Sequence, residues 1–330
     1  MTTLTSPHDL LAAIPFLIGY HPQNSLVLVS LKDGAVGMAM RVDLPRDIAI
    51  EGYDLLASHF VREEAEAALI VAYTDQPSAD CESILINTSA ALVRAGIDIK
   101  ESLIVRNNRF RSMLCTDPTC CPPEGTAVPA LDSSRIAAEH VIAGHPMPFE
   151  SVDGLVQSIA AVPSSFESLW QDEVQAFWVS SDAEDINDLQ RDGATAVIDL
   201  AGEYREGRGA EDRELAARII GRLSDIQVRD FALGSHSDET ADFYWAMWRD
   251  LLRIAPRGFV APVASLFASM AYERGEGALA HKALDRALHD DDHYSLALLL
   301  RRVFTAGWPP QSFSAMRAEL HPKVVAGIFG

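Results

Sequence analysis

The sequence is poor in basic residues and has no long apolar run. Its 330 residues include 27 Lys and Arg against 47 Asp and Glu, a formal net charge of −20. Residues 1–150 carry 10 basic and 19 acidic side chains, and residues 151–330 carry 17 and 28. A nucleic-acid partner is disfavoured, because binding the phosphate backbone needs a basic surface. No segment approaches the ~20 uninterrupted apolar residues of a membrane span, so we expect no membrane association.

Cysteine is also scarce, and the beginning of the sequence lacks the basic segment and small-residue cleavage site of a secretory signal peptide. We therefore expect a cytoplasmic protein, in which thiols stay reduced and a disulfide framework is disfavoured. Of the four cysteines, Cys115, Cys120 and Cys121 fall within seven residues. No other segment of the sequence differs so much from the residue pattern of an ordinary packed helix or strand.

Residues 1–150 have the pattern of an α/β domain. The expected strands cover residues 25–31, 36–44, 67–73, 103–106 and 110–114, with connecting helices near 51–66 and 78–95. Asp33-Gly34 and Asn107-Asn108 are turn sequences that predict hairpins, because Gly and Asn tolerate left-handed backbone. Crossover helices make the strands at 36–44, 67–73 and 103–106 parallel, and each hairpin adds an antiparallel partner. We expect a mixed sheet of about five strands with helices on its faces.

Strand patterns end near residue 133, and residues 151–330 predict an all-α helical domain or short helical array. The predicted helices from there on lie near 133–143, 151–161, 164–179, 183–205, 210–223, 238–255, 260–273, 276–289, 293–306 and 310–319. Gly275, Ala280, Leu284 and Ala287 have the offsets of a tetratricopeptide hairpin, in which small residues let two helices pack closely. An ordinary helix bundle is favoured over a tetratricopeptide-like array, since repeats need about three copies to be stable.

Several segments resemble an uncharacterised actinobacterial family, domain of unknown function 4192. The similar segments are Leu10–Val29, Arg41–Pro45, Arg109–Gly125 with its Cys-Cys-Pro, Tyr272–Leu288 and Gly307–Pro310. The resemblance spans most of the chain. It implies a cytoplasmic bacterial protein and supplies no activity.

Polar residues gather at one edge of the predicted sheet, where ligands bind in open α/β folds. The parallel strands end at Asp43, at Thr74-Asp75 and at Arg106-Asn107. The antiparallel partners start at the same edge. The candidate ligand-binding residues are His21, Asn24, Ser25, Asp43, Asp75, Arg106, Asn107 and Arg109. Such a set suits acid–base chemistry or the binding of a small anion. A structural role is favoured over a ligand site, with Ser25 and Asp43 bound to loop amides, Asp75 capping a helix and the arginines paired with the carboxylates.

The cysteine cluster follows the second hairpin, so we expect it away from His21. Zinc prefers four tetrahedral ligands, and Cys115, Cys120 and Cys121 supply three. Cys81 is a poor fourth ligand, whereas His140 or His145 is compatible with the topology. A thiol-based redox element is the second alternative. A reduced structural loop is favoured over both, since free Cys is often a small buried hydrophobe.

The sequence contains no catalytic motif in which a nucleophile, a base and an orienting group have a diagnostic spacing. The favoured hypothesis is a cytoplasmic binding or regulatory protein. Its α/β domain would bind a small anionic ligand or a protein partner, and its acidic helical domain would provide an interaction surface. The alternative is a hydrolase that uses His21 with Asp43 or Asp75.

Overall fold

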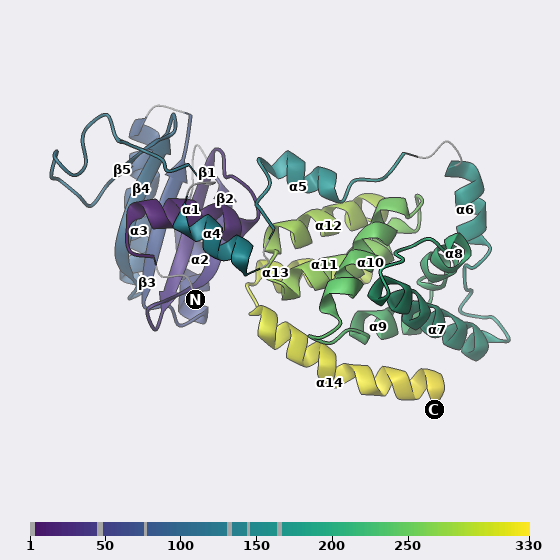
Figure 1. Cartoon of the computed structure of the whole chain (residues 1–330). Coiled ribbons are helices and arrows are strands. Elements are labelled where there is room, and N and C mark those ends of the chain that lie inside the picture. Colours follow the sequence, from purple (N-terminus) through teal and green to yellow (C-terminus); the bar gives the residue numbers. More distant parts are fainter. Residues whose placement is uncertain (1–3, 45–48, 76–77, 131–133, 144–145, 164–166) are drawn as a thin grey trace. The chain divides into compact units, whose positions relative to one another are not determined.

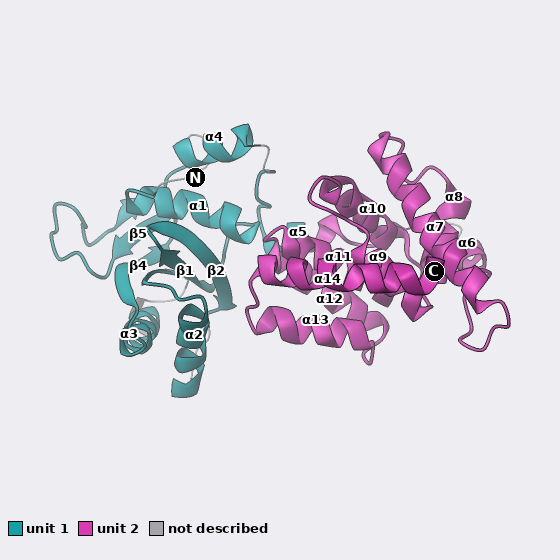
Figure 2. Cartoon of the chain, turned by 90° about the horizontal axis from the view of Figure 1, so that it is seen from below, with its two compact units in different colours: residues 1–155 teal, residues 156–330 magenta. Residues whose placement is uncertain are grey.

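The computed structural model describes residues 4–44, 49–75, 78–130, 134–143, 146–163 and 167–330 (Figure 1). Within it the chain divides into two units, residues 1–155 and residues 156–330 (Figure 2). The first is a mixed sheet with helices and the second is helical, so the predicted fold class is confirmed.

The sheet has six strands in the described part of the chain, in the order β2-β1-β3-β4-β5-β6. These are β1 Ser25–Lys32, β2 Ala35–Asp43, β3 Ala67–Tyr73, β4 Asp98–Arg106, β5 Arg109–Ser112 and β6 Thr126–Ala127. Strand β1 is antiparallel to both β2 and β3, whereas β3 and β4 are parallel. The sixth strand was not predicted, because two residues show no periodicity. Only its pairing with β5 defines it.

Both predicted hairpins are present. Lys32 pairs with Ala35 and Arg106 pairs with Arg109, so each turn contains two residues. All four turn residues have positive φ, with values of 52° and 72° at Asp33 and Gly34, and 50° and 57° at Asn107 and Asn108. This left-handed backbone matches the right-handed twist of the flanking strands, which explains why these turn sequences define the hairpins.

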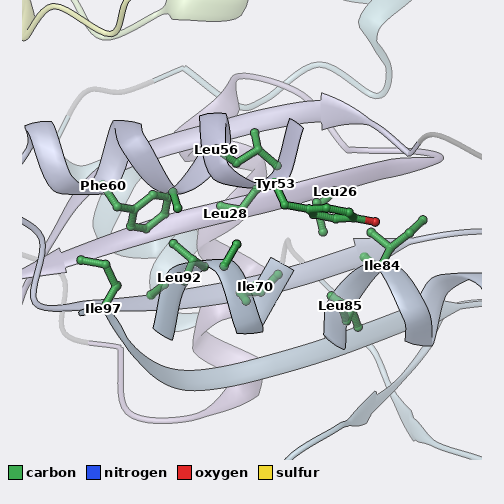
Figure 3. Packing of buried hydrophobic residues seen from close by; sticks show 14 of the residues in the cluster. Leu26, Leu28, Tyr53, Leu56, Phe60, Ile70, Ile84, Leu85, Leu92 and Ile97 are labelled. Atoms are coloured by element: carbon green, nitrogen blue, oxygen red, sulfur yellow. The ribbon is translucent and has the colours of Figure 1, made fainter. Parts of the chain in front are cut away.

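Two layers of helices cover the sheet. Figure 2 shows α1 Pro7–Ile18 and α4 Arg135–Ile142 on one face, with α2 Ile50–Arg62 and α3 Ser78–Arg94 on the other. Leu26 and Leu28 of β1 pack against the α2 and α3 face, where the larger apolar cluster lies (Figure 3). Val27 and Val29 point to the opposite face, because successive strand residues alternate. Since both sets are buried, β1 has the nearly all-apolar sequence of a strand covered on both sides.

Residues 156–330 form the helical unit, whose boundary with the first unit falls inside α5. Its helices are α5 Val152–Ser158, α6 Glu167–Gln175, α7 Ile186–Arg205, α8 Arg213–Arg222, α9 Ile226–Gly234, α10 Ala241–Ile254, α11 Val260–Glu273, α12 Gly277–Asp290, α13 Ser295–Thr305 and α14 Pro310–Phe329. Helix α9, of nine residues, was not predicted. Helix α14 continues ten residues beyond the predicted end, through Pro322.

Helix α11 is the central element of the helical unit, with every residue from Val260 to Tyr272 buried. It forms a helical hairpin with α12 around Gly275, whose φ is +79°. The small residues Ala280 and Ala287 of α12 are fully buried. The tetratricopeptide-like arrangement of further helices stays a prediction. In the described part of the chain, no helix has both the length and the apolar character needed to cross a membrane.

Candidate functional site

The register of the sheet brings the predicted polar residues to one edge, which we call the rim. Ser25, the first residue of β1, lies opposite both Asp43 and Tyr73, the last residues of β2 and β3. Tyr73 in turn lies opposite Val105, one residue before the end of β4. The segments that follow these strand ends therefore lie at the same edge.

A cavity of about 620 Å³ opens at the rim, and we call it the rim pocket. Five of the eight predicted ligand-binding residues line it: His21, Asn24, Asp75, Arg106 and Asn107. Thr74 and Asn108 line it as well. Its size is in the range of small-molecule sites, and it lies where open α/β sheets bind ligands.

Asn24 and Asp75 hold each other across the rim. The Nδ2 of Asn24 donates to Oδ2 of Asp75 at 3.4 Å, and the backbone N–H of Asp75 donates to Oδ1 of Asn24 at 3.2 Å. Asn24 has a φ of +43°, a left-handed conformation that Asn tolerates better than most residues. The amide thereby ties the segment before β1 to the segment after β3.

Arg106 is the only Arg or Lys among the described residues that line the rim pocket. Its side chain is exposed, and among the described residues no group hydrogen-bonds its guanidinium. The partly exposed imidazole of His21 likewise has no hydrogen-bond partner in the described part of the chain. Both groups are thus open to a ligand.

Ser25, Asp43 and Arg109 do not line the rim pocket. The buried Ser25 hydroxyl donates to the carbonyl of Gln23 at 2.6 Å and accepts from Nε of Arg41 at 2.7 Å. Arg41 also pairs with Asp43, with 2.6 Å between Nη1 and Oδ1. These contacts fix the ends of β1 and β2.

Arg109 has a similar structural role at the hairpin of β4 and β5. Its Nε donates to the carbonyl of Glu124 at 2.8 Å, and its Nη2 donates to that of Gly125 at 2.6 Å. The guanidinium therefore holds the segment before β6 against the start of β5.

Sequence reasoning missed the apolar wall of the rim pocket. Leu11, Ala12 and Pro15 of α1 line it, together with Val128, Pro129 and Ala130 after β6. No local signal could have identified them, because apolar residues on an amphipathic helix look alike whether they face a core or a cavity.

The hydrolase alternative requires the imidazole of His21 beside a carboxylate. Within the described residues it hydrogen-bonds neither candidate. Asp75 is bound instead by Asn24, and Asp43 by Arg41.

The cysteine cluster lies in the segment between β5 and β6, which extends past the edge of the sheet in Figure 1. The three sulfurs lie within 4.8 Å of one another. Contact with the backbone of Asp117 lowers the pKa of the Cys115 thiol. The hydrogen bond with Cys115 raises the pKa of the Cys121 thiol.

The fourth-ligand candidates are not part of this cluster. Cys81 belongs to α3 and is buried in the core that this helix forms with α2 and the sheet. His140 stacks on Phe16 with ring centroids 4.4 Å apart. His145 lies outside the described residues.

A family model described as a domain of unknown function (DUF4192) matches residues 7–311. The chain belongs to this family. The DUF4192 match begins at the first residue of α1 and ends at the start of α14, so it includes the rim pocket and the cysteine cluster. No curated protein and no solved structure matches the chain.

Proposed function

We propose that residues 1–155 act as a binding module that takes up a small ligand with an anionic group in the rim pocket. The observation that supports this proposal most is Arg106, whose exposed guanidinium lines the pocket and has no hydrogen-bond partner among the described residues. A guanidinium presents several N–H donors in a planar fork that matches a carboxylate or a phosphate.

The other lining residues restrict the ligand further. Asn107 and Asn108 add neutral amides beside Arg106, and amides can hydrogen-bond an anion without changing the charge of the site. Asp75 repels a second negative charge and accepts hydrogen bonds, so the ligand should carry a hydroxyl or amine at that end. The apolar wall from α1 suits a short carbon skeleton between the two ends.

The matched test compares the wild-type full chain with two separate variants of it, Arg106→Gln and Arg109→Gln. The two arginines pair across the same hairpin, but only Arg106 lines the pocket. Glycerol 3-phosphate serves as the probe, with glycerol as the neutral control, and amide NMR shifts on titration report binding. We expect the Asn24, Asp75 and Asn107 signals to respond to a charged probe and not to glycerol.

Loss of a hydrogen bond to a charged group costs about 1.5–3 kcal/mol, so Arg106→Gln should weaken binding about tenfold to a hundredfold. Arg109→Gln should bind as the wild type does. Equal binding by Arg106→Gln and the wild type, or the absence of any shift at the pocket, would contradict the proposal. That the helical domain binds a protein partner stays a prediction.

A further inference from the structure

The exposure of the cysteine cluster is a feature that packing does not explain. Cys120 is exposed, and Cys115 and Cys121 are only partly buried. Cys81, by contrast, is 1% exposed within the core. Because free cysteines that serve only as small hydrophobes are buried, the one exposed and two partly buried cysteines are unlike the packing cysteine of the same unit.

The backbone around the cluster is fixed by its own hydrogen bonds. Oγ of Ser112 accepts the N–H groups of Leu114 and Cys115, and it donates to Glu101 at 2.7 Å. The N–H of Cys121 donates to the carbonyl of Asp117 at 2.7 Å, which turns the chain back toward Cys115. The convergence of the sulfurs therefore follows from the fold of this segment.

The spacing of the sulfurs fits one soft metal ion. A Zn–S bond of about 2.3 Å places the sulfurs of a tetrahedral site about 3.8 Å apart. Since the three sulfurs lie within 4.8 Å of one another, small side-chain rotations bring them to that distance. Thiolates select Zn²⁺ and Cu⁺ over hard cations.

We propose that Cys115, Cys120 and Cys121 bind one Zn²⁺ ion as thiolates and leave its fourth position to solvent or a small ligand. Among the described residues, no other His, Cys, Asp or Glu joins the three sulfurs, so the part of the chain that the structure describes supplies three ligands. Three protein ligands with an open fourth position are typical of exchangeable or reactive zinc sites rather than closed structural ones. This site is separate from the rim pocket, which none of the three cysteines lines.

The test begins with the full chain, reduced, stripped of metal by a chelator and then desalted. We expect Zn²⁺ titration followed by desalting and elemental analysis to give one equivalent per chain. Co²⁺ in place of Zn²⁺ should give sulfur-to-cobalt charge-transfer absorption, which reports thiolate ligands directly. Each of Cys115→Ser, Cys120→Ser and Cys121→Ser should lose the bound equivalent and this absorption.

The matched control is Cys81→Ala, which removes the buried thiol and should keep one equivalent of zinc. Thermal unfolding of the metal-free variants separates loss of a ligand from loss of the fold, since the cluster lies outside the core. Zinc retained by the three Ser variants would overturn the proposal. So would a reduced wild-type chain that holds no zinc, and a disulfide formed within the cluster in air would then indicate a redox element.

Discussion

At the scale of single residues, the carboxylate of Glu273 contacts the buried side chains of both His236 and Arg317. Its Oε2 lies 2.9 Å from Nε2 of His236, and its two oxygens accept from Nε and Nη2 of Arg317 at 2.7 and 3.0 Å. Arg317 also donates to the carbonyls of Gly234 and His236. One carboxylate thus links the end of α11, the segment after α9 and helix α14.

These contacts determine how Glu273 affects stability across pH. Burial raises the pKa of Glu273, but the hydrogen bonds and charges of His236 and Arg317 outweigh burial and bring the pKa below its ordinary value. A carboxyl group with a lowered folded-state pKa stabilises the fold above its unfolded-state pKa. This stabilisation is lost as pH falls through the folded-state pKa.

We therefore expect Glu273→Gln to lower the free energy of unfolding by about 3 kcal/mol at pH 7, because it leaves the buried Arg317 without its counter-charge. The difference from the wild type should shrink in acid, where the wild-type carboxylate is protonated too. Urea unfolding at several pH values measures both effects. Glu214→Gln, at an exposed pair with Arg218, should change stability little. A loss that stays constant from pH 7 into acid would contradict this account.

At the scale of elements, close helix packing depends on glycine at selected positions. A Cβ on Gly221 of α8 would lie 2.5 Å from the backbone carbonyl oxygen of Val174 in α6. That oxygen cannot move without shifting the helix. Gly202 of α7 has nothing within 4 Å of the same added atom. The two helical glycines therefore differ only in what surrounds them.

Alanine at the two positions should have opposite effects. Gly221→Ala forces α6 and α8 apart, which we expect to cost about 1–3 kcal/mol. Gly202→Ala should stabilise by up to about 1 kcal/mol, because Ala has the higher helix propensity. Chemical denaturation of both variants beside the wild type gives the two differences. Equal effects at the two sites would show that propensity alone, and not contact with Val174, decides the outcome.

At the scale of the whole molecule, each unit has an apolar core of its own. The α2 and α3 face of the sheet encloses one, with Phe60, Ile70 and Leu92 fully buried. The helical unit has another around α11, where Phe267 is fully buried. Lengths of 155 and 175 residues are those of ordinary domains.

We expect residues 1–155 and residues 156–330 to fold when expressed separately. Circular dichroism should show a mixed α/β spectrum for the first and a helical spectrum for the second, each with cooperative thermal unfolding. Because the boundary lies inside α5, pieces 1–150 and 151–330 serve as a second pair that keeps this helix whole. Failure of both pairs to fold, beside a folded full chain, would contradict two independent domains.

The sequence by itself determined the features that depend on near neighbours. Asp33-Gly34 and Asn107-Asn108 defined their hairpins because few residue pairs tolerate left-handed backbone. Strand direction then followed from the crossover rule and brought Asp75 and Arg106 to one edge. Elements without a local signal were missed, such as β6, whose two residues form a strand only through β5.

Only the tertiary structure decided which polar residues face a cavity and which are used internally. Arg106 and Arg109 are alike in sequence and paired in the sheet, yet one lines the rim pocket and the other binds the carbonyls of Glu124 and Gly125. The full exposure of Cys120 and the partial exposure of Cys115 and Cys121, beside the burial of Cys81, were equally beyond the sequence. The physical reason is the same in both cases: hydrogen-bond partners and burial are set by segments distant in the chain, which local propensity does not encode.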